Sequence, residues 1–311
     1  MLRKNASRCG RFFVGIMLMA AQLAVAQVKT ADLRIRDPFV FPNLADSTYY
    51  LYANENPRIA VYKSRDLENW EKAGIAFDPP AGFWGTKDFW APDVYKYRGK
   101  FYMLATFSAP GRKRGTSILV GDHPAGPFAP LKNGPSTPDS NMCLDGIIYT
   151  GKDGKPWLVW CWEWLEVGDG RIMAQRLSRD LKSAVGKPIE LTRAGDAPWT
   201  GPVSGEGKTG IVTDGPFFHR MQNGEMIMIW SSFTKSGKYA IGVARSASGE
   251  LKGPWKHDPG PLNADDGGHA MLFRDFSGQL RISYHAPNGA PHTRVRIYKV
   301  TEENGKLKII Q

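Results

Sequence analysis

The chain reads Arg36-Asp37-Pro38-Phe39-Val40 where its first run of β-forming residues begins, and four similar phrases follow. They are Trp90-Ala91-Pro92-Asp93-Val94, Leu144-Asp145-Gly146-Ile147-Ile148, Thr213-Asp214-Gly215-Pro216-Phe217 and Gly267-Gly268-His269-Ala270-Met271. The four aspartates and the histidine are separated by 56, 52, 69 and 55 residues. A period of this size, filled with short strands, is how a β-propeller appears in sequence. The sequence therefore predicts an all-β protein folded as a five-bladed β-propeller.

A second strand is predicted after each phrase, beyond a turn rich in Gly, Asn, Asp or Ser. These strands occupy residues 48–53, 100–105, 156–160, 225–230 and 279–284. Five blades of about 55 residues each account for the chain after its N-terminal segment. We expect residues 27–311 to form one propeller domain.

The first 26 residues have the composition of a secretory signal peptide. Basic residues precede an apolar run from Phe12 to Ala26, which ends in the small-residue site Ala24-Val25-Ala26. The run is too short to cross a bilayer comfortably. We therefore expect export, cleavage before Gln27, a secreted or periplasmic location and no insertion of the mature chain into a membrane.

The net charge and the cysteine content reduce the number of functions that the chain could have. The net charge of +11 falls to +7 without the signal segment, and no basic cluster alternates with aromatic residues as in a nucleic-acid surface. Cys143 and Cys161 remain after cleavage, and the apolar strand around Cys161 favours buried thiols over a bridge between them. We expect no nucleic-acid partner and a monomeric protein.

Radial symmetry brings the beginning of every blade to one axis, so aspartates about fifty residues apart meet in one pocket. Glycoside hydrolysis needs a carboxylic acid on one face of the sugar and a carboxylate on the other. Asp37 and Asp214 open blades on opposite sides of the axis, a separation that suits inversion. Asp145, close to Asp214, raises the pKa of that acid by charge repulsion.

The order and spacing of these phrases resemble the five-bladed glycosidases of family 43, which include arabinan- and xylan-active members. The resemblance extends over residues 30–300. It implies that Asp37 is the general base, that Asp145 orients the acid and adjusts its pKa, and that Asp214 is the general acid. It also implies that His269 helps to hold an ion or a water on the axis. The Trp90-Ala91-Pro92-Asp93 phrase is typical of the family as well.

One position departs from this pattern. The family usually has glutamate as its general acid, whereas this chain has Asp214, whose carboxyl lies about 1.5 Å further back. Glu163, at the end of a blade-three strand, and Glu206, in a glycine-rich loop, are therefore alternative acids that we also expect near the substrate. Trp90 and Trp162 are predicted to form walls on which sugar rings stack.

No cofactor is required by this chemistry, although clustered carboxylates would attract calcium or sodium near His269. The leading hypothesis is an exported hydrolase that removes arabinofuranosyl or xylosyl units from polysaccharides or oligosaccharides by inversion. A carbohydrate-binding propeller without activity is the alternative from another class. A glycoside phosphorylase is a third, but it needs a phosphate-binding cluster that Arg36 and His269 alone do not make.

Overall fold

The computed structural model describes residues 26–311, which form five antiparallel sheets around an axis. Blade one contains β2 (Val40–Asn43), β3 (Thr48–Glu55), β4 (Arg58–Ser64) and β5 (Asn69–Phe77), with β1 (Gln27–Lys29) paired to the outer edge of β5. Blade two contains β6 (Lys87–Tyr97), β7 (Lys100–Ala109), β8 (Arg112–Gly121) and β9 (Ala129–Pro130). Blade three contains β10 (Cys143–Thr150), β11 (Pro156–Trp162), β12 (Arg171–Leu177) and β13 (Ala184–Arg193).

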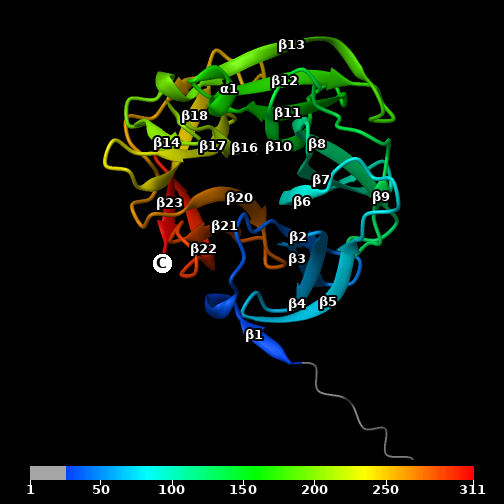
Figure 1. The fold of residues 1–311 in the computed structure, drawn as a ribbon. Coiled ribbons are helices and arrows are strands. Elements are labelled where there is room, and N and C mark those ends of the chain that lie inside the picture. The colour runs from blue at the N-terminus through cyan, green and yellow to red at the C-terminus, as the bar shows by residue number, and fades with distance from the viewer. Residues whose placement is uncertain (1–25) are drawn as a thin grey trace, which may run out of the picture.

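The last two blades complete the ring. Blade four contains β16 (Asp214–Arg220), β17 (Met226–Phe233), β18 (Tyr239–Ser246) and β19 (Lys256–His257). Blade five contains β20 (Gly268–Arg274), β21 (Leu280–Ala286), β22 (Arg294–Glu303) and β23 (Lys306–Ile310). Strand order follows the chain in every blade, and Figure 1 shows β2, β6, β10, β16 and β20 around the centre with β5, β9, β13 and β23 at the rim. The prediction of a five-bladed propeller is confirmed.

The ring closes between blade five and blade one without any exchange of strands. The Val295 N–H donates to the Leu33 carbonyl at 3.1 Å, and the Ser283 hydroxyl donates to the Pro38 carbonyl at 2.8 Å. The second bond lies directly beside the phrase that opens blade one. Closure therefore fixes the position of Asp37 relative to blade five.

Apolar side chains fill the spaces between the blades. Trp70, Trp160 and Trp230 are among the largest fully buried side chains, and each contributes on the order of 2–3 kcal/mol by leaving water. Cys143 and Cys161 are buried free thiols, as the apolar strand around Cys161 predicts. This packed framework holds the inner strands in fixed positions around the axis.

The longest of the four spacings, 69 residues between Asp145 and Asp214, has a structural cause. Between blades three and four the chain forms a separate hairpin of β14 (Val203–Gly205) and β15 (Lys208–Gly210), preceded by the 3-10 turn η2 (Ala194–Asp196). The hairpin packs against the short helix α1 (Trp164–Val167), which follows β11. The remaining 3-10 turn, η1 (Thr30–Asp32), precedes blade one.

No helix in residues 26–311 is long and apolar enough to cross a membrane. The predicted signal peptide falls almost entirely on residues 1–25, which lie outside the described part of the chain. The division into a signal segment and one domain from residue 27 therefore stays a prediction.

Candidate active site

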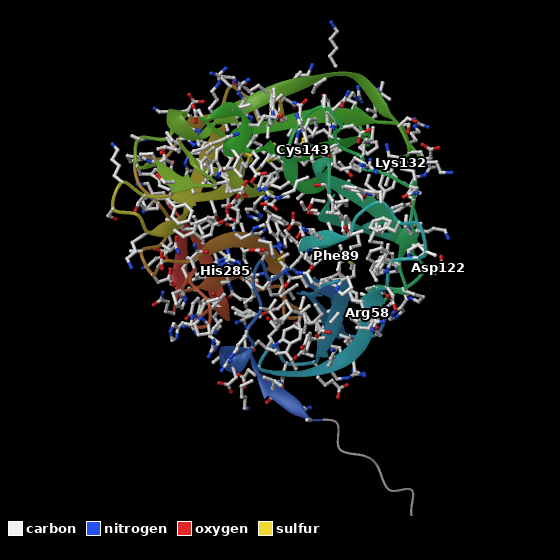
Figure 2. The ribbon with its side chains drawn as sticks, viewed as in Figure 1. Arg58, Phe89, Asp122, Lys132, Cys143 and His285 are labelled. Carbon is white, nitrogen blue, oxygen red and sulfur yellow. The ribbon has the colours of Figure 1, made fainter. Side chains whose placement is uncertain are left out.

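A pocket of about 710 Å³ lies where the inner strands begin, and every blade contributes to its wall. The residues that the sequence predicted and that line it are Asp37, Trp90, Asp145, Glu163, Asp214 and His269. The structure therefore brings together side chains that are up to 232 positions apart. Figure 2 shows the dense side-chain packing around this centre and labels His285 on the blade-five sheet.

A β-bulge at the beginning of the blades aims these side chains. In blade three, Leu144 pairs with Cys161 and Ile147 pairs with Val159, so the inner strand contains one extra residue. Blades two, four and five show the same shift. The bulged residues have φ between 46° and 54°, as does Asp37 in blade one: Asp37, Ala91, Asp145, Gly215 and His269. Bulges of this kind redirect side chains next to active sites.

The predicted register is wrong in two blades, because the bulged residue is not the aspartate. In blade four the bulged residue is Gly215, and Asp214 lies one position before it, paired with Ser231. In blade two the bulged residue is Ala91, and Asp93 lies two positions after it. Only Asp37, Asp145 and His269 thus occupy equivalent places. Asp214 still lines the pocket, whereas Asp93 is buried beneath it.

Asp37 is surrounded by groups that favour its ionised form. Its Oδ1 lies 3.3 Å from Nδ1 of His269, and the charge of Arg36 is next to it in the chain. Burial alone would raise the pKa of Asp37, but His269, and more weakly the charge of Arg36, oppose burial, and that pKa lies well below its usual range. Asp37 is therefore a carboxylate across the working pH range, as a general base must be.

The pKa values of Asp145 and Asp214 are shifted upward, opposite to that of Asp37. Burial, and next the charge of Asp37, raise the pKa of Asp145 to about 8. Burial, and next the charge of Asp145, raise the pKa of Asp214 to about 7. Asp145 Oδ2 accepts the Gly215 N–H at 2.9 Å, and Asp214 Oδ2 accepts the Tyr239 hydroxyl at 2.8 Å. The pocket therefore contains two carboxyls whose pKa values are raised and one whose pKa is lowered.

The two alternative acids are held by one arginine. Arg114 forms an ion pair with Glu163 and lies 3.5 Å from Glu206 Oε1, and its guanidinium stacks on Trp90 at 4.9 Å from the ring centre. Burial raises the pKa of Glu163 although Arg114 opposes it. The Glu206 side chain is 66% exposed and is not part of the pocket lining. Of the two, only Glu163 reaches the pocket.

The aromatic wall differs from the predicted one. Trp90 lines the pocket as expected, but Trp162 does not. Trp162 Nε1 donates to Glu166 at 2.6 Å, and Arg171 stacks on the ring at 5.1 Å. The strand ends at Trp162 and α1 begins at Trp164, so the change of backbone direction brings Trp164 to the pocket instead. Phe233 and Tyr239, which no motif in the sequence marks, also line it.

The side chains around His269 determine whether the predicted calcium or sodium ion could bind there. Among residues 26–311, no group of three or more His, Cys, Asp or Glu is arranged to hold a metal. A cavity of about 10 Å³, lined by Asp37, Asp93 and His269 among others, lies beneath the pocket. That volume suits about one water-sized occupant with polar neighbours. Calcium or sodium at this place stays a prediction, and no chemical step depends on it.

The chain is similar to known proteins that act on glycosidic bonds. Residues 31–305 match the family model described as Glycosyl hydrolases family 43. The chain is 30% identical over 122 residues to the extracellular exo-alpha-(1->5)-L-arabinofuranosidase ArbA of Cellvibrio japonicus. It is also 30% identical over 119 residues to the extracellular endo-alpha-(1->5)-L-arabinanase 1 of Bacillus subtilis. These alignments span 36% and 34% of this chain, and 33% and 36% of those relatives, so they cover about a third of each.

A solved structure is similar over a much longer range. The endo-arabinase from Bacteroides thetaiotaomicron is 52% identical and superposes with a TM-score of 0.87, over 90% of this chain and 98% of that one. A thermostable family-43 glycoside hydrolase follows with 27% identity and a TM-score of 0.76, over 89% of this chain and 93% of that one. The similarity thus includes every blade.

Proposed function

The chain belongs to family 43 of the glycosyl hydrolases, and from this premise we propose that it hydrolyses arabinofuranosyl linkages of arabinan or its oligosaccharides with inversion. The observation that carries the proposal is that Asp37 and Asp214 line one pocket, in surroundings that shift the pKa values of the two carboxyls in opposite directions. The pKa of Asp37 is well below its usual range, and that of Asp214 is raised to about 7. Glycoside hydrolysis needs such a division into a carboxylate and an acid, and inversion is the outcome that we propose for it.

The reaction assigns one role to each carboxyl. Asp37 removes a proton from a water molecule, whose oxygen attacks the anomeric carbon. The bond from that carbon to the leaving oxygen breaks, and the leaving oxygen takes the proton of Asp214. Burial is the main reason that Asp214 stays protonated near neutral pH, and Asp145, whose carboxyl accepts the Gly215 N–H, adds charge repulsion when it is ionised.

Asp214 is the preferred acid because its surroundings differ from those of Glu163 and Glu206. The Glu163 carboxylate pairs with Arg114, so protonating it would remove one of the two buried or half-buried carboxylates, Glu163 and Asp88, that balance this guanidinium. Glu206 lies mostly in solvent. Within the proposal, Glu163 holds Arg114 against Trp90 and so shapes the wall that contacts the sugar.

The proposed substrate rests on the pocket wall and on the similar proteins. Trp90, Trp164 and Phe233 offer ring faces to the apolar faces of sugars, and the carboxyls offer acceptors for hydroxyls. The relatives named above are an exo-acting arabinofuranosidase, an endo-arabinanase and an endo-arabinase. Two of them are named extracellular, which supports the export of this chain.

A phosphorylase is less well supported. Arg36 is the only pocket-lining residue among those described that carries a permanent positive charge. A phosphate ion normally needs several such donors. The pocket is suited to water as the nucleophile.

The test is hydrolysis of linear arabinan, an aryl α-L-arabinofuranoside and an aryl β-D-xyloside, with the first-formed sugar followed by proton NMR. We expect turnover of the arabinosyl substrates and an inverted anomer. Turnover of the xyloside alone would contradict the substrate, and a retained anomer would contradict the mechanism. A chain that binds arabinan in calorimetry but cleaves none of these substrates would instead be a carbohydrate-binding propeller.

A further inference from the structure

The bulges leave backbone N–H groups without acceptors in their own blades, and neighbouring blades supply the acceptors from equivalent side chains. A bulged residue leaves the hydrogen-bond ladder, so its buried N–H needs another acceptor. The Asp145 N–H donates to Oγ1 of Thr106 at 3.0 Å, and the His269 N–H donates to Oγ of Ser231 at 2.8 Å. Each acceptor belongs to the preceding blade. The bulge of one blade is thus fixed by a side chain of another.

Blade one follows the same rule across the closure of the ring. The Asp37 N–H donates to Nδ1 of His285, in blade five, at 3.2 Å. Asn288 Oδ1 accepts a bond from Arg36 Nη2 at 2.9 Å and lies 3.1 Å from His285 Nε2. Since Oδ1 is an acceptor, Nε2 of His285 carries the proton, and Nδ1 of the neutral ring has the lone pair that receives the Asp37 N–H.

The three acceptors occupy one equivalent position. Thr106, Ser231 and His285 each pair with the residue just before the bulge of their own blade, namely Trp90, Asp214 and Gly268. All three acceptors are 0% exposed. A buried polar side chain at the same place in three blades, each bonded to the next bulge, is a repeated structural device.

Blade three departs from this pattern, and the departure explains the orientation of Asp145. The equivalent residue there is Cys161, paired with Leu144, and a thiol is a weak acceptor. The Gly215 N–H donates instead to the Asp145 carboxylate. Asp145 therefore replaces the missing side chain and directs its carboxyl toward blade four.

We propose that Thr106, Ser231 and His285 are positioning residues that set the reacting groups by fixing the backbone of Asp145, His269 and Asp37. The inference rests on the proposed function, because it assumes that these groups act on a sugar. A displacement of about 1 Å can lower a rate by up to ~100-fold while the binding contacts persist. The positioning residues should therefore affect kcat much more than KM.

The first experiment compares two adjacent serines. Ser231 and Ser232 are both fully buried in β17, but the Ser232 hydroxyl has no hydrogen-bond partner among the described residues. Ser231→Ala should lower kcat about tenfold and Thr106→Val by about tenfold or more, with KM within about twofold. Ser232→Ala should leave kcat unchanged. Equal effects of Ser231→Ala and Ser232→Ala would overturn the inference, because burial alone would then explain the loss.

The second experiment separates the two nitrogens of His285. His285→Asn places an amide oxygen near the position of Nδ1, whereas His285→Gln reaches toward the position of Nε2. We expect His285→Asn to retain at least about a tenth of kcat and His285→Gln to lose about 100-fold. The reverse order would contradict the bond to the Asp37 N–H. Thermal melts of both variants identify any loss caused by unfolding.

A third measurement does not depend on activity. Amide hydrogen exchange, followed by NMR of the ¹⁵N-labelled protein, should be faster at Asp145 in Thr106→Val and at His269 in Ser231→Ala, but unchanged at both in Ser232→Ala. Unchanged exchange in the first two variants would overturn the inference even if the enzyme is active. Faster exchange in a protein that cleaves no pentoside would support it and contradict the proposed function instead.

Discussion

Removing the Tyr239 hydroxyl tests the assignment of Asp214 as the acid more sharply than removing Asp214 itself. Tyr239 is buried, and its hydroxyl donates to Asp214 Oδ2 at 2.8 Å. A donor at this place favours the ionised carboxyl. Tyr239→Phe keeps the ring in the pocket wall and removes only the donor, so the pKa of Asp214 should rise from about 7.

The size of the change follows from the strength of the bond. A hydrogen bond to a charged group contributes about 1.5–3 kcal/mol, and 1.36 kcal/mol corresponds to one pKa unit. The pKa of Asp214 should therefore rise by about 1–2 in Tyr239→Phe. Since a general acid must be protonated to act, kcat/KM falls as the pH rises through its pKa. The decline on the basic side should move from near pH 7 to about pH 8–9.

The assay is kcat/KM from about pH 4 to pH 10 on an arabinofuranoside with a poor leaving group. Tyr284→Phe is the matched control, because the buried Tyr284 hydroxyl donates to Asp265 at the same 2.8 Å, and Tyr284 is not part of the pocket lining. We expect the control profile to match that of the unmodified chain. A basic limb in Tyr239→Phe that stays in place, or moves to lower pH, would refute Asp214 as the acid.

Three further predictions follow from the same structure. Asp37→Asn should lower kcat at least ~100-fold with unchanged sugar affinity, measured by calorimetry, because a base acts only in the chemical step. Asp214→Asn should be far less impaired on an activated aryl arabinofuranoside than on a poor leaving group; if Glu163→Gln shows that dependence instead, the acid is Glu163. Gly268→Ala should destabilise the fold by about 1–3 kcal/mol in chemical denaturation, because a Cβ there would lie 2.3 Å from Tyr239; full stability would contradict this packing.

Much of the fold was available from the sequence because each blade is one contiguous segment. The spacing of the five phrases reflects the length of a blade, and the strands after each phrase are local in sequence. For the same reason Asp37, Asp145 and His269 could be recognised as neighbours at the axis. The long spacing before Asp214 has its cause in the hairpin β14–β15, which the structure shows between blades three and four.

The register of Asp214 required the tertiary structure. A bulge adds a residue to one strand relative to its partner, and the alternation of side chains then changes at a point that the single strand does not mark. Hence the sequence placed Asp214 in register with Asp37, whereas Gly215 occupies that position. Trp162 was misplaced for a related reason, because the chain leaves the strand immediately after it.

The supporting residues also depended on the assembled ring. Thr106, Ser231 and His285 belong to strands that read in sequence only as buried β-structure, and each acts on a residue of another blade. Their partners lie 39, 38 and 248 positions away in the chain. The sequence determined which acidic and histidine side chains meet near the axis, because each of them lies at the opening of a contiguous blade. The structure decided how those groups are held, because hydrogen bonds between blades exist only once the ring has closed.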